Sequence, residues 1–169
     1  DTTYYYITAD LGVGKRTVPQ GSSAVSPNTI INSYTAYAIH KTESSSAIKT
    51  TLKSGREWYG EDFEFTNTRD FNFTLKEVNN SKPISLTTAV VGRSPSANRF
   101  NVQVNDQALY DVVYSAVTIS DNENYYARSA QQTGTTFINN NEVKISLSHT
   151  KVSSEANAWL NYISINAFT

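Results

Sequence analysis

Hydrophobic and polar residues alternate with a period of two along most of the chain, and helical periodicity is scarce. The clearest segments are 71–75, 100–104 and 143–147, where Phe, Leu, Val or Ile occupies every second position. Successive side chains of a strand point to opposite faces, so each segment predicts a strand with one face in a core and one in solvent. Segments 84–91 and 159–168 are apolar on both faces over part of their length, which is typical of central strands.

The remaining strand candidates are 4–9, 29–41, 58–65, 112–119 and 125–130, which brings the total to about ten. Polar turn residues separate them, and the pattern predicts tight hairpins at 105–107 and 139–141, because Asn and Asp tolerate left-handed backbone. A helix could cover part of 45–53. The sequence therefore predicts an all-β fold, a jelly-roll-like antiparallel sandwich with about ten strands and at most one short helix.

Length and composition narrow the function classes. The 169 residues fit a single β-sandwich domain, 1–169, without an internal linker. Lys and Arg number 14 against 15 Asp and Glu, so the chain lacks the basic excess of a general nucleic-acid binder. No apolar run approaches the roughly 20 residues of a membrane-spanning helix. The absence of Met suggests a piece of a longer protein or a processed product, and the low charge with abundant Ser, Thr and Asn favours a secreted or outer cell-surface location.

Catalytic chemistry finds little support in the sequence. Only His40 and His149 could act as a general base near neutral pH, and each lies at a strand end in phase with apolar residues. We expect both to be packed, hydrogen-bonded residues. Two His without any Cys do not form a zinc site, and neither Asp121–Asn124 nor Asn139–Glu142 has the spacing of a calcium loop. We therefore expect no catalytic residues, no metal and no cofactor.

Carboxylates cluster around Trp58 and Tyr59, with Arg56 beside them; they are Glu57, Glu61, Asp62 and Glu64. A glycosidase could use two such groups at about 5–9 Å. Neighbouring residues in a strand point to opposite faces, however, so pairing of Arg56 with a Glu is the preferred interpretation.

Adjacent aromatic residues raise a different possibility. They occur at Tyr4–Tyr6, at Trp58–Tyr59 and at Tyr125–Tyr126. Exposed aromatic rings can stack on the C–H faces of sugars, so a carbohydrate-binding module is the alternative functional interpretation. Two or more coplanar rings in one groove would favour sugar binding, whereas buried rings would favour a structural role.

Two stretches resemble one protein family. The segment 54–63, Ser-Gly-Arg-Glu-Trp-Tyr-Gly-Glu-Asp-Phe, is similar to a Gly-Arg-x-Trp-Tyr-Gly-Glu-x-Phe motif of PorU-type proteins, gingipain-related cysteine peptidases of the bacterial type IX secretion system. The segment 158–163, Ala-Trp-Leu-Asn-Tyr-Ile, resembles the Ala-Trp-Leu-Asp-Tyr-Ile of that family, with Asn161 in place of the acid. His40 lies where the family has a His-Glu pair, but Lys41 follows it here. The resemblance covers roughly residues 40–168.

The resemblance implies an N-terminal β domain of a cell-surface signal peptidase or sortase. The family's catalytic Cys and His lie C-terminal to the matched region, and this chain has no Cys, so no catalytic residue transfers. The implied partners are the C-terminal peptidase domain of the same protein and secretion-system or cargo proteins, with a glycan as the partner in the alternative. The candidate structural or docking motif consists of Gly55, Arg56, Glu57, Trp58, Tyr59, Gly60, Glu61 and Trp159.

Local chemistry gives each part of the motif an expected role. Gly55 and Gly60 would let the chain turn at both ends, and Arg56 would pair with Glu57 or Glu61. We also expect both Trp58 and Trp159 to be largely buried.

Overall fold

The computed structural model describes residues 12–14, 16–19, 21, 31–43, 57–119 and 125–169. The chain divides into two units, Asp1–Ile31 and Asn32–Thr169. In the first unit the described residues are all exposed. The second unit contains every strand that the structure describes.

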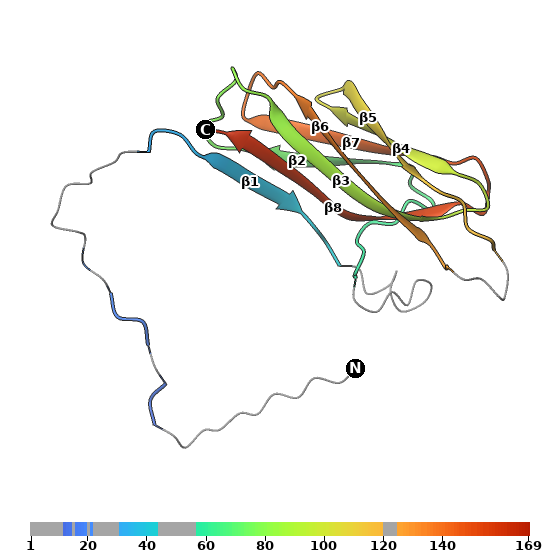
Figure 1. The fold of residues 1–169 in the computed structure, drawn as a ribbon, viewed down its shortest axis with the longest axis horizontal. Coiled ribbons are helices and arrows are strands. Elements are labelled where there is room, and N and C mark those ends of the chain that lie inside the picture. The colour runs from blue at the N-terminus through green and yellow to red at the C-terminus, as the bar shows by residue number, and fades with distance from the viewer. Residues whose placement is uncertain (1–11, 15, 20, 22–30, 44–56, 120–124) are drawn as a thin grey trace. The chain divides into compact units, whose positions relative to one another are not determined.

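Eight strands form two stacked antiparallel sheets (Figure 1). The strands are β1 Thr35–His40, β2 Thr68–Thr74, β3 Ile84–Arg93, β4 Asn98–Val104, β5 Gln107–Tyr114, β6 Arg128–Thr136, β7 Glu142–Thr150 and β8 Asn157–Phe168. Sheet A has the order β1-β8-β3-β6, and sheet B has the order β2-β7-β4-β5. These orders are those of a jelly roll, and the described residues contain no helix, which confirms the predicted fold class.

The strand count of about ten was too high, because the described residues form eight. Segment 58–65 is not a strand and contributes only an isolated bridge at Asp62. Strand β6 starts at Arg128 and runs to Thr136, whereas the predicted strand was 125–130. The prediction ended too early because the Ser, Gln and Thr residues of β6 show no apolar alternation. The candidate strand 4–9 and the candidate helix 45–53 lie outside the described residues.

The two predicted hairpins have different outcomes. At 105–107 the prediction is confirmed: Asn105 and Asp106 have φ values of +49° and +67°, and they join the paired strands β4 and β5. At 139–141 the prediction was wrong. This segment connects β6 of sheet A to β7 of sheet B, so it crosses between the layers and closes no hairpin. Polar residues mark both connections equally well, which is why the sequence could not separate them.

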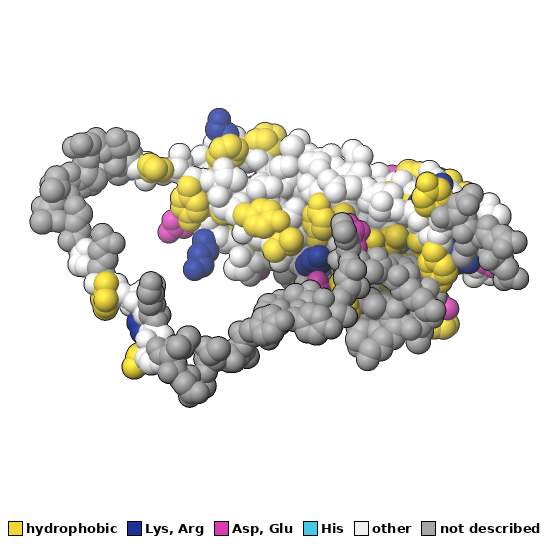
Figure 2. Space-filling view, turned by 60° about the horizontal axis from the view of Figure 1, so that its bottom comes forward, with side chains coloured by type: hydrophobic (Ala, Val, Ile, Leu, Met, Phe, Trp, Pro, Cys, Tyr) yellow, Lys and Arg dark blue, Asp and Glu magenta, His cyan; other side chains and the backbone are white. Residues whose placement is uncertain are grey.

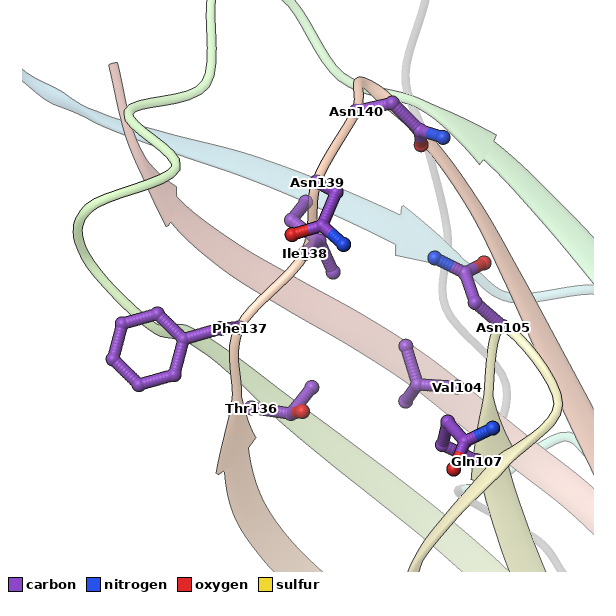
Figure 3. Close-up of a pocket in the computed structure, with 8 residues that line it drawn as sticks. All are labelled: Val104, Asn105, Gln107, Thr136, Phe137, Ile138, Asn139 and Asn140. Atoms are coloured by element: carbon purple, nitrogen blue, oxygen red, sulfur yellow. The ribbon is translucent and has the colours of Figure 1, made fainter.

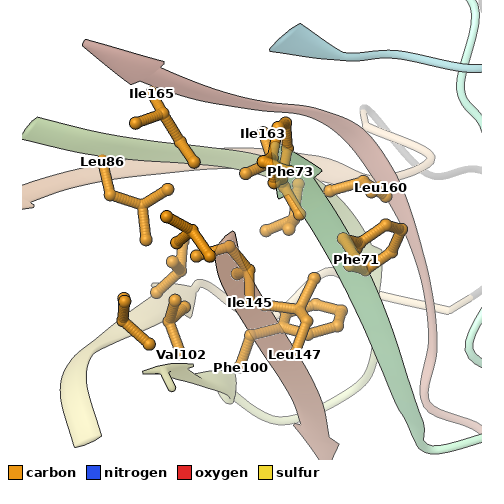
Figure 4. Close-up of a cluster of buried hydrophobic side chains, with 14 of the residues drawn as sticks. Phe71, Phe73, Leu86, Phe100, Val102, Ile145, Leu147, Leu160, Ile163 and Ile165 are labelled. Carbon is orange, nitrogen blue, oxygen red and sulfur yellow. The ribbon is translucent and has the colours of Figure 1, made fainter. Parts of the chain in front are cut away.

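The core lies between the inner faces of the two sheets (Figure 4). Leu86, Ile163 and Ile165 of sheet A face Ile145 and Leu147 of sheet B, and all five are fully buried. The alternating apolar positions of the sequence identified the inner faces of β4 and β7 correctly. In β8 strict alternation was wrong, because a register shift opposite Ala89 and Val90 places Leu160 in the core with Ile163 and Ile165, and Trp159 in a separate cluster.

On one side of the sandwich, β5 of sheet B and β6 of sheet A approach each other closely at a glycine. A Cβ atom at Gly134 of β6 would lie 2.5 Å from the ring of Tyr110 of β5, so only glycine admits this ring. The Tyr110 hydroxyl lies 3.1 Å from Thr88 Oγ1 and donates to the Leu86 carbonyl oxygen at 3.2 Å. The strands β1 and β2 lie on the opposite side, where the rings of His40 and Phe71 are 4.7 Å apart.

Candidate functional site

The Trp-Tyr-Gly-Glu motif extends the edge of sheet A beyond the end of β1. The Gly60 amide donates to the Leu160 carbonyl at 2.8 Å, and the Leu160 amide donates to the Glu61 carbonyl at 2.9 Å. The Phe63 amide donates to the Ala158 carbonyl at 2.9 Å. The two stretches that carry the family resemblance are therefore hydrogen-bonded to each other.

Tyr59 is the aromatic anchor of this motif. It packs with Val91 and Trp159 in a small buried cluster, with Tyr126 against it, separate from the main core. Its hydroxyl donates to Glu57 Oε2 at 2.7 Å. Burial raises the pKa of the Tyr59 phenol well above its ordinary value, and the hydrogen bond to Glu57 and the charge of that carboxylate add to the rise.

The two Trp residues differ. Trp159 is 2% exposed, which confirms the prediction for this residue, whereas Trp58 is 42% exposed, so the prediction for Trp58 was wrong. Adjacent side chains in an extended segment point in opposite directions, and Tyr59 takes the inward position. Alternation alone turns one of two neighbouring rings inward, but it does not determine which one.

Gly60 has a different role from the predicted turn. A Cβ atom there would lie 2.2 Å from Thr42 Oγ1 and 2.8 Å from the Thr42 carbonyl oxygen. Glycine is thus needed because the two chain segments approach closely. Gly55 and Arg56 lie outside the described residues, so the predicted turn at Gly55 and the pairing of Arg56 remain predictions.

Glu61 binds His40 across this contact, with 2.8 Å between Oε1 and Nε2. Burial alone would raise the pKa of the Glu61 carboxyl, but hydrogen bonds from His40, its own backbone and Thr42, together with the charge of His40, lower it below its ordinary value. An open cleft of about 320 Å³ lies beside the pair, with Arg69 on its wall. The Arg69 guanidinium donates to the Asp62 carbonyl oxygen, at 2.9 Å from Nη2.

These contacts favour a structural role over a catalytic role for the carboxylates around Tyr59. The carboxylates of Glu57, Glu61 and Asp62 each accept a hydrogen bond from a neighbouring protein group. Among the described residues no group of three or more His, Cys, Asp or Glu side chains could hold a metal ion. The predicted structural interpretation of His40, a hydrogen-bonded residue at a strand end, is confirmed.

His149 is buried inside the sandwich, as predicted, and is 3% exposed. Its Nε2 atom lies 2.8 Å from the Tyr114 hydroxyl, and its ring stacks on Phe100 with centroids 4.6 Å apart. Burial lowers the pKa of the imidazole to about 4, and the charge of Lys151 acts in the same direction. A substrate in solvent could not reach this side chain.

The aromatic pair Tyr125–Tyr126 does not form an open sugar platform. The guanidinium carbon of Arg128 lies 3.9 Å from the centre of the Tyr125 ring, and that of Arg93 lies 4.1 Å from the centre of the Tyr126 ring. One face of each ring is therefore covered by a cation. Tyr4–Tyr6 and the acidic segment 121–124 lie outside the described residues.

The outward face of sheet A is a feature that sequence reasoning missed. Alternation and pairing place on it Ser, Thr, Asn, Gln, Ala and aromatic or aliphatic residues, and the one charged residue that they place there is Arg93 at the end of β3. Arg128 of β6 pairs with Gly92 and so belongs to the other face. Sheet B carries charged residues on its outward face; they are Asp70, Arg99, Asp111, Glu142 and Lys144. The signal in the sequence was the scarcity of charged residues at every second position of four separate segments. These positions form one surface only when the strands pair.

The edge of this face at β1 is also apolar. Tyr37 is 59% exposed and Ile39 is 49% exposed, and both point outward. Within the described part of the chain, β1 pairs only with β8. Figure 2 shows hydrophobic side chains in a row across the face turned to the viewer, with few charged ones among them. We refer to Tyr37, Ile39 and the free edge of β1 as the β1 edge.

No protein-family model matches the chain, and no curated protein matches its sequence. Among solved structures, dimeric latent PorU from Porphyromonas gingivalis is similar, with a TM-score of 0.65 and 20% identity over 85% of this chain and 13% of the PorU chain. The CBM36-1 domain of a multidomain xylanase from the hindgut metagenome of Trinervitermes trinervoides has a TM-score of 0.49 and 12% identity, over 77% of this chain and 96% of that domain.

The likeness to PorU concerns the fold, and this chain spans only a small part of the length of PorU. The structure thus shows an all-β sandwich without Cys that is similar to one segment of a much longer protein. No helix within the described residues is long and apolar enough to cross a membrane.

Proposed function

We propose that this chain is a non-catalytic N-terminal domain of a gingipain-like peptidase of the type IX secretion system, secreted or at the outer cell surface. The domain packs on the peptidase domain of the same protein or positions cargo. The observation that carries this proposal is the hydrogen-bonded pairing of 60–63 with 158–160, the two stretches that resemble the family. The similarity in fold to a 13% segment of PorU supports it.

The β1 edge supplies the docking surface. Burying Tyr37 and Ile39 removes apolar area from water, and the neighbouring Thr and Ser side chains carry no charge that would need to be desolvated. An edge strand without Lys or Pro also offers free backbone groups to a partner. Natural edge strands usually avoid combining exposed apolar side chains with unpaired backbone groups, so a partner that covers the β1 edge would explain its composition.

The test uses the intact parent protein. Its gene should encode a Cys/His peptidase domain after residue 169, and cross-linking with mass spectrometry should join that domain to residues near β1. Tyr37→Lys combined with Ile39→Lys should abolish these cross-links. Val113→Lys is the matched control, because Val113 is exposed on the outward face of sheet B. A gene without such a peptidase domain, or cross-links that survive the double substitution, would refute the proposal.

Carbohydrate binding is the second candidate function. The specific observation in its favour is the exposed indole of Trp58. The neighbouring residue Glu57 lines a polar cleft together with Gln131 and Asn161. A glycan array probed with the wild-type chain and with Trp58→Ala tests this function. Signals that disappear in the variant would support it, and an array without signals would exclude it for the glycans displayed.

A further inference from the structure

A second polar cleft lies where the chain crosses from sheet A to sheet B, between β6 and β7. It has a volume of about 290 Å³ and lies between the β4–β5 turn and residues 136–140 (Figure 3). Buried Val104 and Ile138 provide apolar surface inside it. The other side chains that face it are neutral amides and a hydroxyl; they are Asn105, Gln107, Thr136, Asn139 and Asn140.

Both walls are held by hydrogen bonds that leave most of the amide groups available. Asn105 Oδ1 accepts from the Lys144 amide at 2.9 Å, which fixes one wall. The Asn139 carbonyl accepts from Asn80 Nδ2 at 3.1 Å, and the Asn141 carbonyl accepts from the Leu75 amide at 2.8 Å, which fix the other.

The free polar groups are those of the side chains. Within the described residues, the side-chain amides of Gln107, Asn139 and Asn140 have no protein partner, although each carries donors and acceptors. In Figure 3 the Asn139 amide and the Asn105 amide group lie on facing walls, and the Phe137 ring projects away from the cleft.

We propose that this cleft binds a neutral saccharide unit. An amide offers a donor and an acceptor side by side, which matches two neighbouring hydroxyl groups of a sugar, and the apolar surface can accept the C–H groups between them. Among the described residues no charged side chain lines the cleft, so these residues offer no ion pair to an anionic or cationic ligand. A volume near the lower end of ligand sites, roughly 300 Å³, suits one or two sugar rings.

This site is independent of docking at the β1 edge and of Trp58. The ligand class is the same as in the second candidate function, but the residues are different. Variants can therefore separate the failure of one idea from the failure of the other.

The test titrates the full chain with a panel of neutral mono- and disaccharides built from glucose, galactose, mannose, xylose and N-acetylglucosamine. Nuclear magnetic resonance follows the side-chain amide signals of Gln107, Asn139 and Asn140. We expect at least one sugar to shift these signals. Gln107→Ala and Asn139→Ala should each weaken binding by roughly 2- to 12-fold, the loss of about one neutral hydrogen bond. Asn67→Ala is the matched control, since Asn67 is exposed and its carbonyl accepts from the His149 amide, at the end of β7 opposite to Lys144.

Several results would overturn the proposal. One is a panel in which no sugar shifts the three amide signals. Another is sugar binding that Trp58→Ala abolishes and the cleft variants leave unchanged, which would assign the sugar to the aromatic site. A third is a neutral Gly-Ser peptide that shifts the signals when no sugar does, which would make the cleft a peptide site.

Discussion

Acidification should destabilise this domain through one buried side chain, His149. The imidazole is enclosed by Phe100 and Tyr114 and is neutral in the folded state, with its pKa lowered from 6.5 to about 4. In the unfolded chain it becomes protonated as the pH falls through 6.5. The unfolded state then binds more protons than the folded state, so the stabilisation is complete above pH 6.5 and is lost as the pH falls toward 4.

Linkage gives the size of the loss. With these two pKa values, the free energy of unfolding should decrease by about 2 kcal/mol between pH 7 and pH 5 and by about 3 kcal/mol between pH 7 and pH 4. The first interval lies above the ordinary range of Asp and Glu, so it isolates the His contribution. For a domain of this size the melting temperature should fall by roughly 4–8 °C between pH 7 and pH 5.

The assay is urea unfolding followed by circular dichroism at pH 7 and pH 5. His149→Gln keeps an acceptor for the Tyr114 hydroxyl but does not titrate, so this variant should lose most of the pH dependence. His40→Gln should retain it, because His149 is still present. Equal stability of the wild type at both pH values, or an undiminished pH dependence in His149→Gln, would refute the conclusion that the His149 imidazole is buried and neutral in the folded state.

The remaining predictions concern packing. Trp159→Ala should lower the free energy of unfolding by about 3–5 kcal/mol because Trp159 is buried, whereas Trp58→Ala should change it by at most about 0.5 kcal/mol. Chemical denaturation checks both, and equal effects would contradict the opposite orientations of the two side chains. Gly92→Ala should cost about 1–3 kcal/mol, because its Cβ atom would lie 2.3 Å from the Tyr114 ring. A melting temperature equal to that of the wild type would show that this ring can move without cost.

Alternation predicted the central strands because their inward residues are consistently apolar. The same logic ended the predicted strand 125–130 too early, because β6 lies at a sheet edge and its sequence, Arg-Ser-Ala-Gln-Gln-Thr-Gly-Thr-Thr, has almost no apolar face. Its place in the sheet depends on backbone pairing with β3 and on Gly134, whose lack of a side chain accommodates Tyr110. Such a strand is defined by its neighbours more than by its own sequence.

The candidate site was predictable only in part. The motif around Tyr59 and Trp159 was recognisable from its residues, but the inward direction of Tyr59 depends on the register of 60–63 against β8. The contact between His40 and Glu61 joins residues 21 positions apart, and it exists because the motif continues the sheet edge where β1 ends. The outward face of sheet A, which carries little charge, and the amide cleft each combine several segments, so neither appears in any single stretch of sequence.

Hydrogen exchange can show whether the β1 edge docks on a peptidase domain of the same protein. The measurement compares β1 amides in the isolated 169-residue chain and in the intact parent protein. The amides of Thr35–His40 should exchange more slowly in the intact protein, and Tyr37→Lys with Ile39→Lys should restore the faster exchange. Identical exchange of these amides in the two proteins would show that the β1 edge does not dock on the peptidase domain.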